Sequence, residues 1–298
     1  KMHTIGEEVL DGVLASVALA EKQFDGLVVW HDAPFAVGAN LKQVSGAIEA
    51  GQWDLLEATV EKFQRASMCL KYAQIPVVAA MQGMALGGGC EFGMHAARRV
   101  LALESYIGLV EAGVGLIPAG GGSKEFAVRA ARHAAATATP GEVFNFLQPV
   151  FTNIAMAKVS ASAHDAIAKG YALPTDTVLF NARELLWVAL REARAMADAN
   201  YAPPLPARDI PVAGRNGIAT FEMMLVNMLE GGMISQHDYL VSRSAAAALC
   251  GGDIDTGTRV DEEWLLKVER RLFVDLLKHP LTQARIKHTL ETGKPLRN

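Results

Sequence analysis

The first third of the chain alternates short apolar runs with longer stretches in which apolar residues recur at helical spacing. Residues 5–22 and 53–72 show the helical period, whereas Leu27–Trp30 and Val77–Met81 are continuous apolar runs. Runs of this length are typical of strands that are buried on both faces of a parallel sheet. The alternation therefore predicts an α/β fold in which helices lie outside a parallel sheet.

The next segment is shorter and richer in glycine. The glycines that follow Met81 predict a loop, residues 91–99 a short helix, Val100–Leu103 a third strand and Tyr106–Val110 a fourth. Helical periods dominate beyond Ser123, including Asn181–Asn200 and three C-terminal stretches at residues 218–229, 235–249 and 261–277.

Ala202–Pro206, with its three prolines, is the best candidate for a linker. We therefore predict a core over residues 1–200 and a helical C-terminal region over residues 201–298 that serves packing or assembly.

Composition narrows the class of protein. Of the 298 residues, 51% are hydrophobic and 20% charged, which is enough apolar material for a sizeable core. Every long apolar run is interrupted by charge, so we expect no membrane insertion. A formal net charge of −4 argues against nucleic acid as the main partner.

Cysteine and histidine spacing disfavours metal and disulfide chemistry. Cys69, Cys90 and Cys250 are far apart and form no CxxC pair, which predicts a reducing, cytoplasmic location and no cysteine-based zinc site. The eight histidines show no HExxH spacing, so we expect no metal. No secretory signal is visible at the start, and from the unusual opening Lys1-Met2-His3 we expect a fragment of a longer polypeptide.

Two glutamates lie beside glycine-rich segments. Glu91 closes the run GMALGGGCE and Glu111 opens the run EAGVGLIPAGGG. A carboxylate beside bare backbone can transfer protons while nearby N–H groups hold a developing negative charge. Two such segments predict a paired acid/base site.

Simpler interpretations compete with this one. A single glycine run is more often a tight turn, and Glu91 could be a cap that the helix dipole favours. Glu111 is harder to explain as surface, because its neighbours are apolar; burial would raise its pKa, as a general acid requires. A phosphate loop is disfavoured because Gly120–Lys124 ends in Ser-Lys. Solvated helix faces are expected for Glu7, Glu8, Glu262 and Glu263.

A third segment, FAVGANLK at Phe35–Lys42, precedes the two glutamate motifs. The three motifs in this order resemble the crotonase superfamily of enoyl-CoA hydratases and isomerases, over roughly residues 1–200. Thr289–Asn298 further resembles the C-terminal hydratase region of bacterial 3-hydroxyacyl-CoA dehydrogenase fusion proteins. The resemblance implies a spiral ββα core with a helical C-terminal region, and it implies further strands upstream of Lys1.

The same resemblance implies roles for individual residues. The N–H groups of Ala39 and Gly88 would form an oxyanion hole for the thioester carbonyl of an acyl-CoA. Glu91 and Glu111 would act jointly as the catalytic carboxylates. Lys42, which could equally be a surface helix lysine, would face the CoA phosphates. The other implied substrate-binding residues are Lys1, Ala36, Gly38, Asn40, Leu41, Gly87, Leu109, Pro118 and Ala119.

Three positions depart from the usual family pattern. Asn40 replaces an Asp, Leu109 replaces a frequent Gln, and Ala119 replaces a frequent Gly. These departures affect the expected rate and chain-length preference.

The implied activity is hydration of trans-2-enoyl-CoA to 3-hydroxyacyl-CoA in fatty-acid β-oxidation, without metal or redox cofactor. NAD would bind only to an upstream dehydrogenase part, because no strand–GxGxxG–helix pattern occurs here. The alternatives are a Δ3-Δ2-enoyl-CoA isomerase and a catalytically silent acyl-CoA-binding module. The chain is expected to assemble as a homo-oligomer or within a larger fusion protein.

Overall fold

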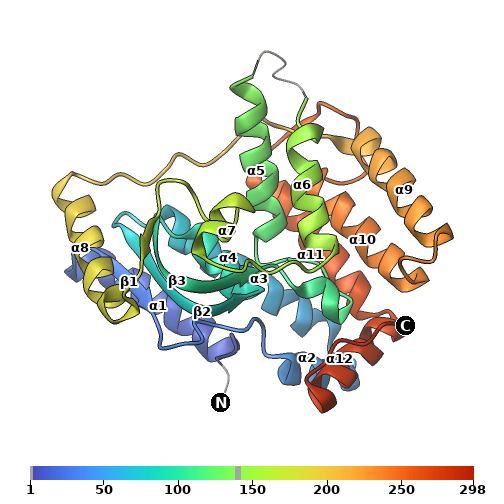
Figure 1. Cartoon of the computed structure of the whole chain (residues 1–298), viewed down its shortest axis with the longest axis horizontal. Coiled ribbons are helices and arrows are strands. Elements are labelled where there is room, and N and C mark those ends of the chain that lie inside the picture. The colour runs from blue at the N-terminus through green and yellow to red at the C-terminus, as the bar shows by residue number, and fades with distance from the viewer. Residues whose placement is uncertain (1–2, 138–141) are drawn as a thin grey trace. The chain divides into compact units, whose positions relative to one another are not determined.

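A computed structural model of the chain describes residues 3–137 and 142–298 (Figure 1). The chain forms two compact units, each assembled from three separate segments. The first unit comprises Lys1–Asn40, Glu61–Leu109 and Val159–Pro206. The second unit comprises Leu41–Val60, Val110–Lys158 and Ala207–Asn298.

A four-stranded parallel sheet organises the first unit. Its order is β1-β2-β3-β4, formed by Leu27–Trp30, Val77–Leu86, Arg98–Gly108 and Thr177–Leu179. Val78 of β2 and Val100 of β3 are completely buried and pack with Leu185 of helix α8 (Leu185–Asp198). Burial on both faces explains the continuous apolar run of β2 over residues 77–81. The expectation of a fully buried strand is wrong for β1, which is half-buried and ends at the exposed Trp30. The predicted α/β class with a parallel sheet is confirmed.

Two long helices of the first unit begin and end close to the predicted positions. The unit contains α1 (Glu7–Gln23), the C-terminal part of α3 (Trp53–Tyr72), α4 (Gly88–His95), α7 (Ala163–Ala168), the 3-10 helix η2 (Ala182–Glu184) and α8. The predicted helices at residues 5–22 and 53–72 are therefore confirmed.

The predicted break inside β3 is wrong. Residues 100–103 and 106–110 were expected to form two strands, but one strand continues to Gly108. Met81 pairs with Leu101 and Gly83 with Ser105, so β3 bulges between Leu101 and Ser105. The Ser105 hydroxyl lies 3.1 Å from the Met81 carbonyl oxygen and 2.7 Å from that of Ala102. This side chain supplies a polar partner where the ladder is interrupted.

Two neighbouring boundaries also differ from the prediction. β2 extends to Leu86, so the first half of the glycine-rich segment is strand and not loop. The helix expected over residues 91–99 begins earlier, at Gly88, and ends at His95. Arg98 and Arg99 are absent from this helix because they pair with β2.

The second unit is mainly helical. It contains α2 (Leu41–Glu49), the start of α3, η1 (Glu111–Val114), α5 (Gly122–Ala135), α6 (Phe144–Ala155), α9 (Gly214–Glu230), α10 (Gln236–Leu249), α11 (Glu262–Leu277) and α12 (Pro280–Thr292). Two short antiparallel strands, β5 (Ile210–Pro211) and β6 (Arg259–Val260), accompany them.

The helical C-terminal region is confirmed, including the three predicted helices. Helix α12 was not predicted. Pro280 occupies its first turn, where a missing N–H removes no intrahelical bond.

Ala202–Pro206, the predicted linker, lies outside any helix or strand at the end of the first unit. The two-domain division at residue 200 stays a prediction.

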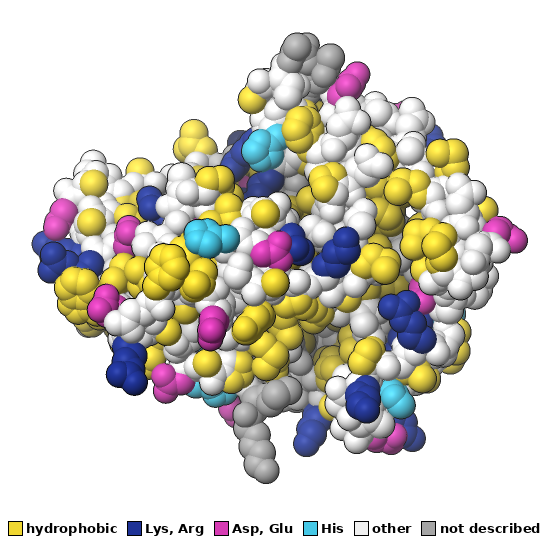
Figure 2. Space-filling view, viewed as in Figure 1, with side chains coloured by type: hydrophobic (Ala, Val, Ile, Leu, Met, Phe, Trp, Pro, Cys, Tyr) yellow, Lys and Arg dark blue, Asp and Glu magenta, His cyan; other side chains and the backbone are white. Residues whose placement is uncertain are grey.

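None of the helices in the described residues has the length and apolar character needed to cross a membrane. Acidic and basic side chains are interspersed on the face of the molecule shown in Figure 2.

Candidate active site

The loop that begins at Phe35 lies along the end of β2. The Ala36 N–H donates to the Met84 carbonyl oxygen at 3.1 Å, and the Leu86 N–H donates to the Ala36 carbonyl oxygen at 2.9 Å. A Cβ atom on Gly89 would lie 2.8 Å from the Cβ of Ala36. Glycine at position 89 therefore allows the loop to approach the start of α4.

The next residues of this loop pair with Ile5 on their other side. The Ile5 N–H donates to the Gly38 carbonyl oxygen at 2.8 Å, and the Asn40 N–H donates to the Ile5 carbonyl oxygen at 3.0 Å. Successive residues of an extended segment point to opposite sides. The N–H of Ala39, which is an exposed residue, therefore points away from Ile5.

Gly87 and Gly88 form the entrance to α4. Gly87 has φ 52° and donates its N–H to the Gly108 carbonyl oxygen at 2.8 Å. Gly88 is the first helical residue, so its N–H has no carbonyl partner within the helix and carries part of the positive end of the helix dipole. A Cβ atom on Gly88 would meet the Phe63 ring at 2.5 Å. The backbone here has the form of an anion-binding helix start.

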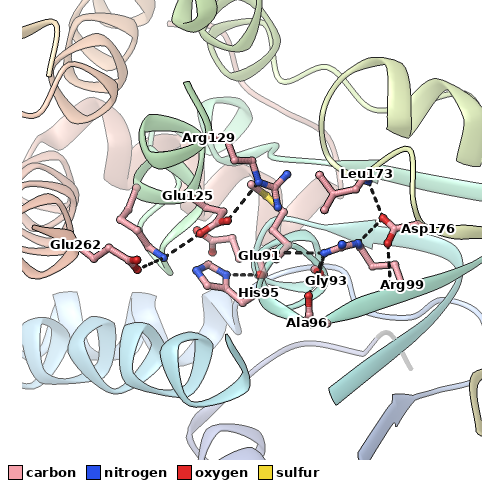
Figure 3. A network of polar contacts seen from close by, with 12 residues as sticks. Glu91, Gly93, His95, Ala96, Arg99, Glu125, Arg129, Leu173, Asp176 and Glu262 are labelled. Atoms are coloured by element: carbon pink, nitrogen blue, oxygen red, sulfur yellow. Dashed lines mark hydrogen bonds and ion pairs between the residues drawn. The ribbon is translucent and has the colours of Figure 1, made fainter. Parts of the chain in front are cut away.

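Glu91 lies in the first turn of α4 and is 3% exposed. Its N–H donates to the Gly87 carbonyl oxygen at 3.0 Å, and Nδ1 of His95 lies 2.7 Å from the Glu91 carbonyl oxygen (Figure 3). Glu91 is therefore a buried carboxylate on a short helix that also carries a candidate oxyanion donor.

Arg99 holds the other end of α4. Its Nη1 donates to the carbonyl oxygens of Gly93 at 3.0 Å and Ala96 at 3.2 Å, while Nε contacts Asp176 (Figure 3). A cation at a helix C-terminus also interacts favourably with the helix dipole. Neither Arg99 nor Asp176 was among the predicted site residues.

The predicted site residues of the first unit are therefore brought together in part. Ala36, Gly38 and Ala39 lie on a loop that packs against the start of α4, where Gly87 and Gly88 precede Glu91. Asn40, which ends this loop, is half-buried, and Leu109 is completely buried.

Glu111 belongs to the second unit, at the start of η1. It is half-buried, and its Oε2 atom is inaccessible to solvent. The Leu116 N–H donates to the Glu111 carbonyl oxygen at 3.0 Å, which closes the turn. Pro118 and Ala119 follow in a buried stretch, and the Ser123 hydroxyl donates to the Pro118 carbonyl oxygen at 3.1 Å. The expectation that Glu111 is not a solvated surface residue agrees with this environment.

The start of α5 shows why a phosphate loop is absent from this glycine run. Glu269 of α11 accepts the N–H groups of Gly121, at 3.1 Å, and Lys124. A protein carboxylate thus occupies the donors that a phosphate would need.

The expectation that Glu262 lies on a solvated helix face is wrong. Glu262 is 4% exposed, and its Oε2 lies 3.2 Å from the ammonium nitrogen of the fully buried Lys124. Lys124 contacts Glu125 at the same distance, and the Glu125 carboxylate also accepts from Arg129 (Figure 3). Burial of Glu262 is possible because a cation from α5 compensates its charge.

Comparison with known proteins identifies the family. The enoyl-CoA hydratase/isomerase family description matches residues 5–140. A probable 3-hydroxyacyl-CoA dehydrogenase of Bacillus subtilis is 37% identical over 299 residues, which cover 100% of this chain and 37% of that protein. These matches confirm the predicted resemblance to the crotonase superfamily.

A second curated relative also matches nearly the whole chain. A putative fatty acid oxidation complex trifunctional enzyme of Rickettsia felis is 27% identical, covering 96% of this chain and 36% of that protein. The chain thus spans little more than a third of the length of these curated relatives.

Solved structures show the crotonase fold. An enoyl-CoA hydratase from Rhodobacter sphaeroides aligns with a TM-score of 0.66 at 18% identity, covering 99% of this chain and 86% of that one. A carnitinyl-CoA dehydratase from Mycobacterium thermoresistibile gives 0.65 at 17% identity, covering 98% and 84%. The predicted fold class is confirmed.

The remaining predicted positions belong to the second unit or lie outside the described residues. Lys42 is exposed and Leu41 half-buried on α2 of the second unit, while Lys1 is not among the described residues. Within residues 3–137 and 142–298, no group of three or more His, Cys, Asp or Glu could hold a metal ion. Burial raises the pKa of the Cys250 thiol to about 12, which makes it a poor nucleophile.

Proposed function

We propose that this crotonase-superfamily chain catalyses the hydration of trans-2-enoyl-CoA to 3-hydroxyacyl-CoA, as a step of fatty-acid β-oxidation. The thioester carbonyl would accept hydrogen bonds from the N–H groups of Ala39 and Gly88. Negative charge that develops on this oxygen would also be stabilised by the dipole of α4.

The proposed chemistry uses Glu91 and Glu111 as a pair. One carboxylate removes a proton from water as the water oxygen bonds to C3, and the C2=C3 π electrons move toward the carbonyl as an enolate. The other, protonated, carboxyl gives its proton to C2 as the enolate collapses. One water is added, the pair ends with as many protons as it began with, and no oxidant, reductant or metal is required.

The observation that carries this proposal is the construction of α4. Its first N–H belongs to Gly88, its first turn holds the buried carboxylate of Glu91, and Arg99 fixes its far end. A loop of extended backbone packs against it and turns the Ala39 N–H away from Ile5. This geometry suits an acyl carbonyl better than a phosphate, because a carboxylate beside the donors would repel a phosphate.

The proposal also includes how the substrate is bound, how the chain assembles and where it acts. The substrate is an acyl-CoA thioester, with Lys42 facing the CoA phosphates as a point charge. Assembly as a homo-oligomer, or as a part of a larger dehydrogenase that binds NAD elsewhere, is proposed with it, as is a cytoplasmic location. Asn40, Leu109 and Ala119 would adjust rate and chain-length preference.

Turnover of crotonyl-CoA, followed as loss of the conjugated thioester absorbance, tests the proposal. Glu91→Gln and Glu111→Gln should each lower kcat by about a hundredfold or more, the scale of general acid/base catalysis. CoA affinity should change little, because both substitutions preserve shape. Glu104→Gln, at an exposed position on β3, serves as the matched control and should retain full activity.

Other outcomes would select the alternatives. A Gln variant that hydrates normally would remove that residue from the mechanism. Binding of crotonyl-CoA without absorbance loss would favour a catalytically silent module. Conversion of 3-enoyl-CoA to 2-enoyl-CoA, with hydration absent, would favour the isomerase.

A further inference from the structure

Glu111 begins the turn η1. The C-terminal end of this turn is hydrogen-bonded to helix α12. The Thr282 hydroxyl donates to the Gly115 carbonyl oxygen at 2.9 Å, and Nε2 of His237 lies 2.9 Å from the same hydroxyl oxygen. A hydroxyl has one proton, so when Thr282 donates to Gly115 the imidazole must donate from Nε2. His237, Thr282 and Gly115 thus form a directed chain of hydrogen bonds.

Burial restricts the movement of these hydrogen-bonded residues. Thr282 is completely buried and His237 is 1% exposed. Nδ1 of His237 is buried and has no hydrogen-bond partner among the described residues. Among the described residues, the imidazole therefore has a hydrogen-bond partner for Nε2 and none for Nδ1. This difference indicates that the contact with Thr282 fixes the orientation of the ring.

A second contact holds the middle of the same turn. Nη1 of Arg285 donates to the Ala112 carbonyl oxygen at 3.4 Å and lies 2.8 Å from a carboxylate oxygen of Asp238. Nε of Arg285 donates to the Asn298 side chain at 2.8 Å. The Arg285 side chain is 2% exposed, so the guanidinium is held by partners rather than by water.

The packing leaves the turn little room to move. Gly115 has φ 79°, and a Cβ atom there would lie 3.0 Å from the Thr282 hydroxyl oxygen and 3.1 Å from Nε2 of His237. Residue 115 must be glycine both for its backbone conformation and for this close approach. The network therefore lies directly on the backbone that follows Glu111.

We propose that Thr282 with His237, and Arg285 with Asp238, are positioning residues that hold η1 so that Glu111 presents its carboxylate in one orientation. The inference rests on the proposed hydration, in which Glu111 exchanges a proton with water or C2. Proton transfer demands near-fixed geometry, and displacement of about 1 Å can cost about a hundredfold in rate. None of these four side chains touches substrate in this account.

The test uses three variants on α12 and steady-state hydration of crotonyl-CoA. Thr282→Val removes the hydroxyl at nearly constant volume, and Thr282→Ser keeps it. Thr292→Val removes an exposed hydroxyl that bonds the neighbouring backbone of His288 and Lys294. Thr282→Val should lower kcat about tenfold or more while KM changes less than about threefold. Thr282→Ser should recover most of the loss, and Thr292→Val should match wild type. The assays should be run well below the melting temperature of each variant, which circular dichroism measures.

Arg285→Lys is a second variant, for use if Thr282→Val does not fold. It keeps a cation opposite Asp238 but lacks the planar fork, and it should give the same fall in kcat with KM little changed. A folded Thr282→Val or Arg285→Lys protein with wild-type kcat would overturn the inference alone. Failure of Thr282→Ser to recover kcat would also overturn it. A wild-type protein that hydrates no enoyl-CoA would overturn the proposed function, and this inference with it.

Discussion

Arg99 and Asp176 form a buried ion pair in the first unit, with Nε and Oδ2 2.5 Å apart and side chains 2% and 0% exposed. The Asp176 carboxylate also accepts the N–H groups of Arg99 and Leu173, at 3.1 and 2.6 Å. Arg99 in turn donates to carbonyl oxygens at the end of α4. The pair is tolerated in the interior because further hydrogen bonds satisfy both groups.

Arg99→Met should therefore be strongly destabilising. The substitution leaves the Asp176 carboxylate buried without its cation and leaves the α4 carbonyls without a donor. Removing one partner of such a pair costs about 3–5 kcal/mol of unfolding free energy. Equilibrium urea unfolding at neutral pH would measure the loss, and the double variant Arg99→Met/Asp176→Leu should lose less than the sum of the single variants.

Arg194→Met is the matched control. Arg194 is 64% exposed and pairs with the exposed carboxylates of Asp25 and Asp198. Its removal should change the urea midpoint little, because water replaces the lost contacts. Equal midpoints for Arg99→Met and Arg194→Met would show that the buried pair does not hold α4.

Local periodicity was sufficient to predict helices α1 and α3 and strand β1, since each depends on its own apolar pattern. The continuity of β3 was not predictable in the same way. It depends on Ser105 reaching the carbonyl oxygen of Met81, a contact between two strands.

The same distinction between local features and long-range contacts applies to the candidate site. The motif resemblance names Gly88 and Glu91 as candidate site residues because glycine spacing and the carboxylate are local features. Ion pairs such as Arg99 with Asp176, 77 residues apart, leave no local signal. For Glu262 the nearby charges suggested solvent, but its partner Lys124 is 138 residues away. Residues that support the candidate site through such contacts can therefore be identified only from the fold.

Gly89→Ala should impair catalysis through the backbone of the neighbouring loop. The added Cβ would lie 2.8 Å from the Ala36 Cβ and 2.9 Å from the Ala36 carbonyl oxygen, distances that require the loop to shift. That loop leads to the proposed oxyanion donor of Ala39, and losing one such donor lowers kcat about 10²–10³-fold. Crotonyl-CoA hydration by the purified variant would measure the effect.

Gly12→Ala controls for the loss of a helical glycine. A Cβ atom there meets nothing within 4 Å, and Gly12 lies inside helix α1. Alanine should keep kcat unchanged and add up to about 1 kcal/mol of stability through helix propensity. A Gly89→Ala enzyme as active as Gly12→Ala would mean that the loop does not supply the oxyanion donor.

His237 should make stability depend on pH in mildly acidic solution. Burial lowers the pKa of its imidazole from 6.5 to about 4; Arg285 and His279 act in the same direction, and Asp238 opposes them. Between these two pH values the unfolded chain binds a proton that the folded chain does not. Unfolding free energy should therefore fall as pH decreases from 6.5 toward 4, and this group adds no slope above pH 6.5.

Urea unfolding across this pH range, for wild type and His237→Gln, would isolate the contribution. The glutamine amide can still donate to Thr282 but does not titrate, so the variant should show a shallower slope. His164→Gln, at an exposed position, should keep the wild-type slope. Parallel slopes for wild type and His237→Gln would contradict the assignment.

Lys124→Met should destabilise the second unit because of the carboxylates it leaves behind. The ammonium group is fully buried and lies 3.2 Å from both Glu125 and Glu262, which are themselves nearly inaccessible. Methionine fills a similar volume but compensates neither charge, so the expected loss is roughly 3–5 kcal/mol. Lys267→Met is the control, since Lys267 pairs with Glu263 on the exposed face of α11 and should affect unfolding little. If urea unfolding gave similar midpoints for both variants, the buried cluster would not be a source of stability.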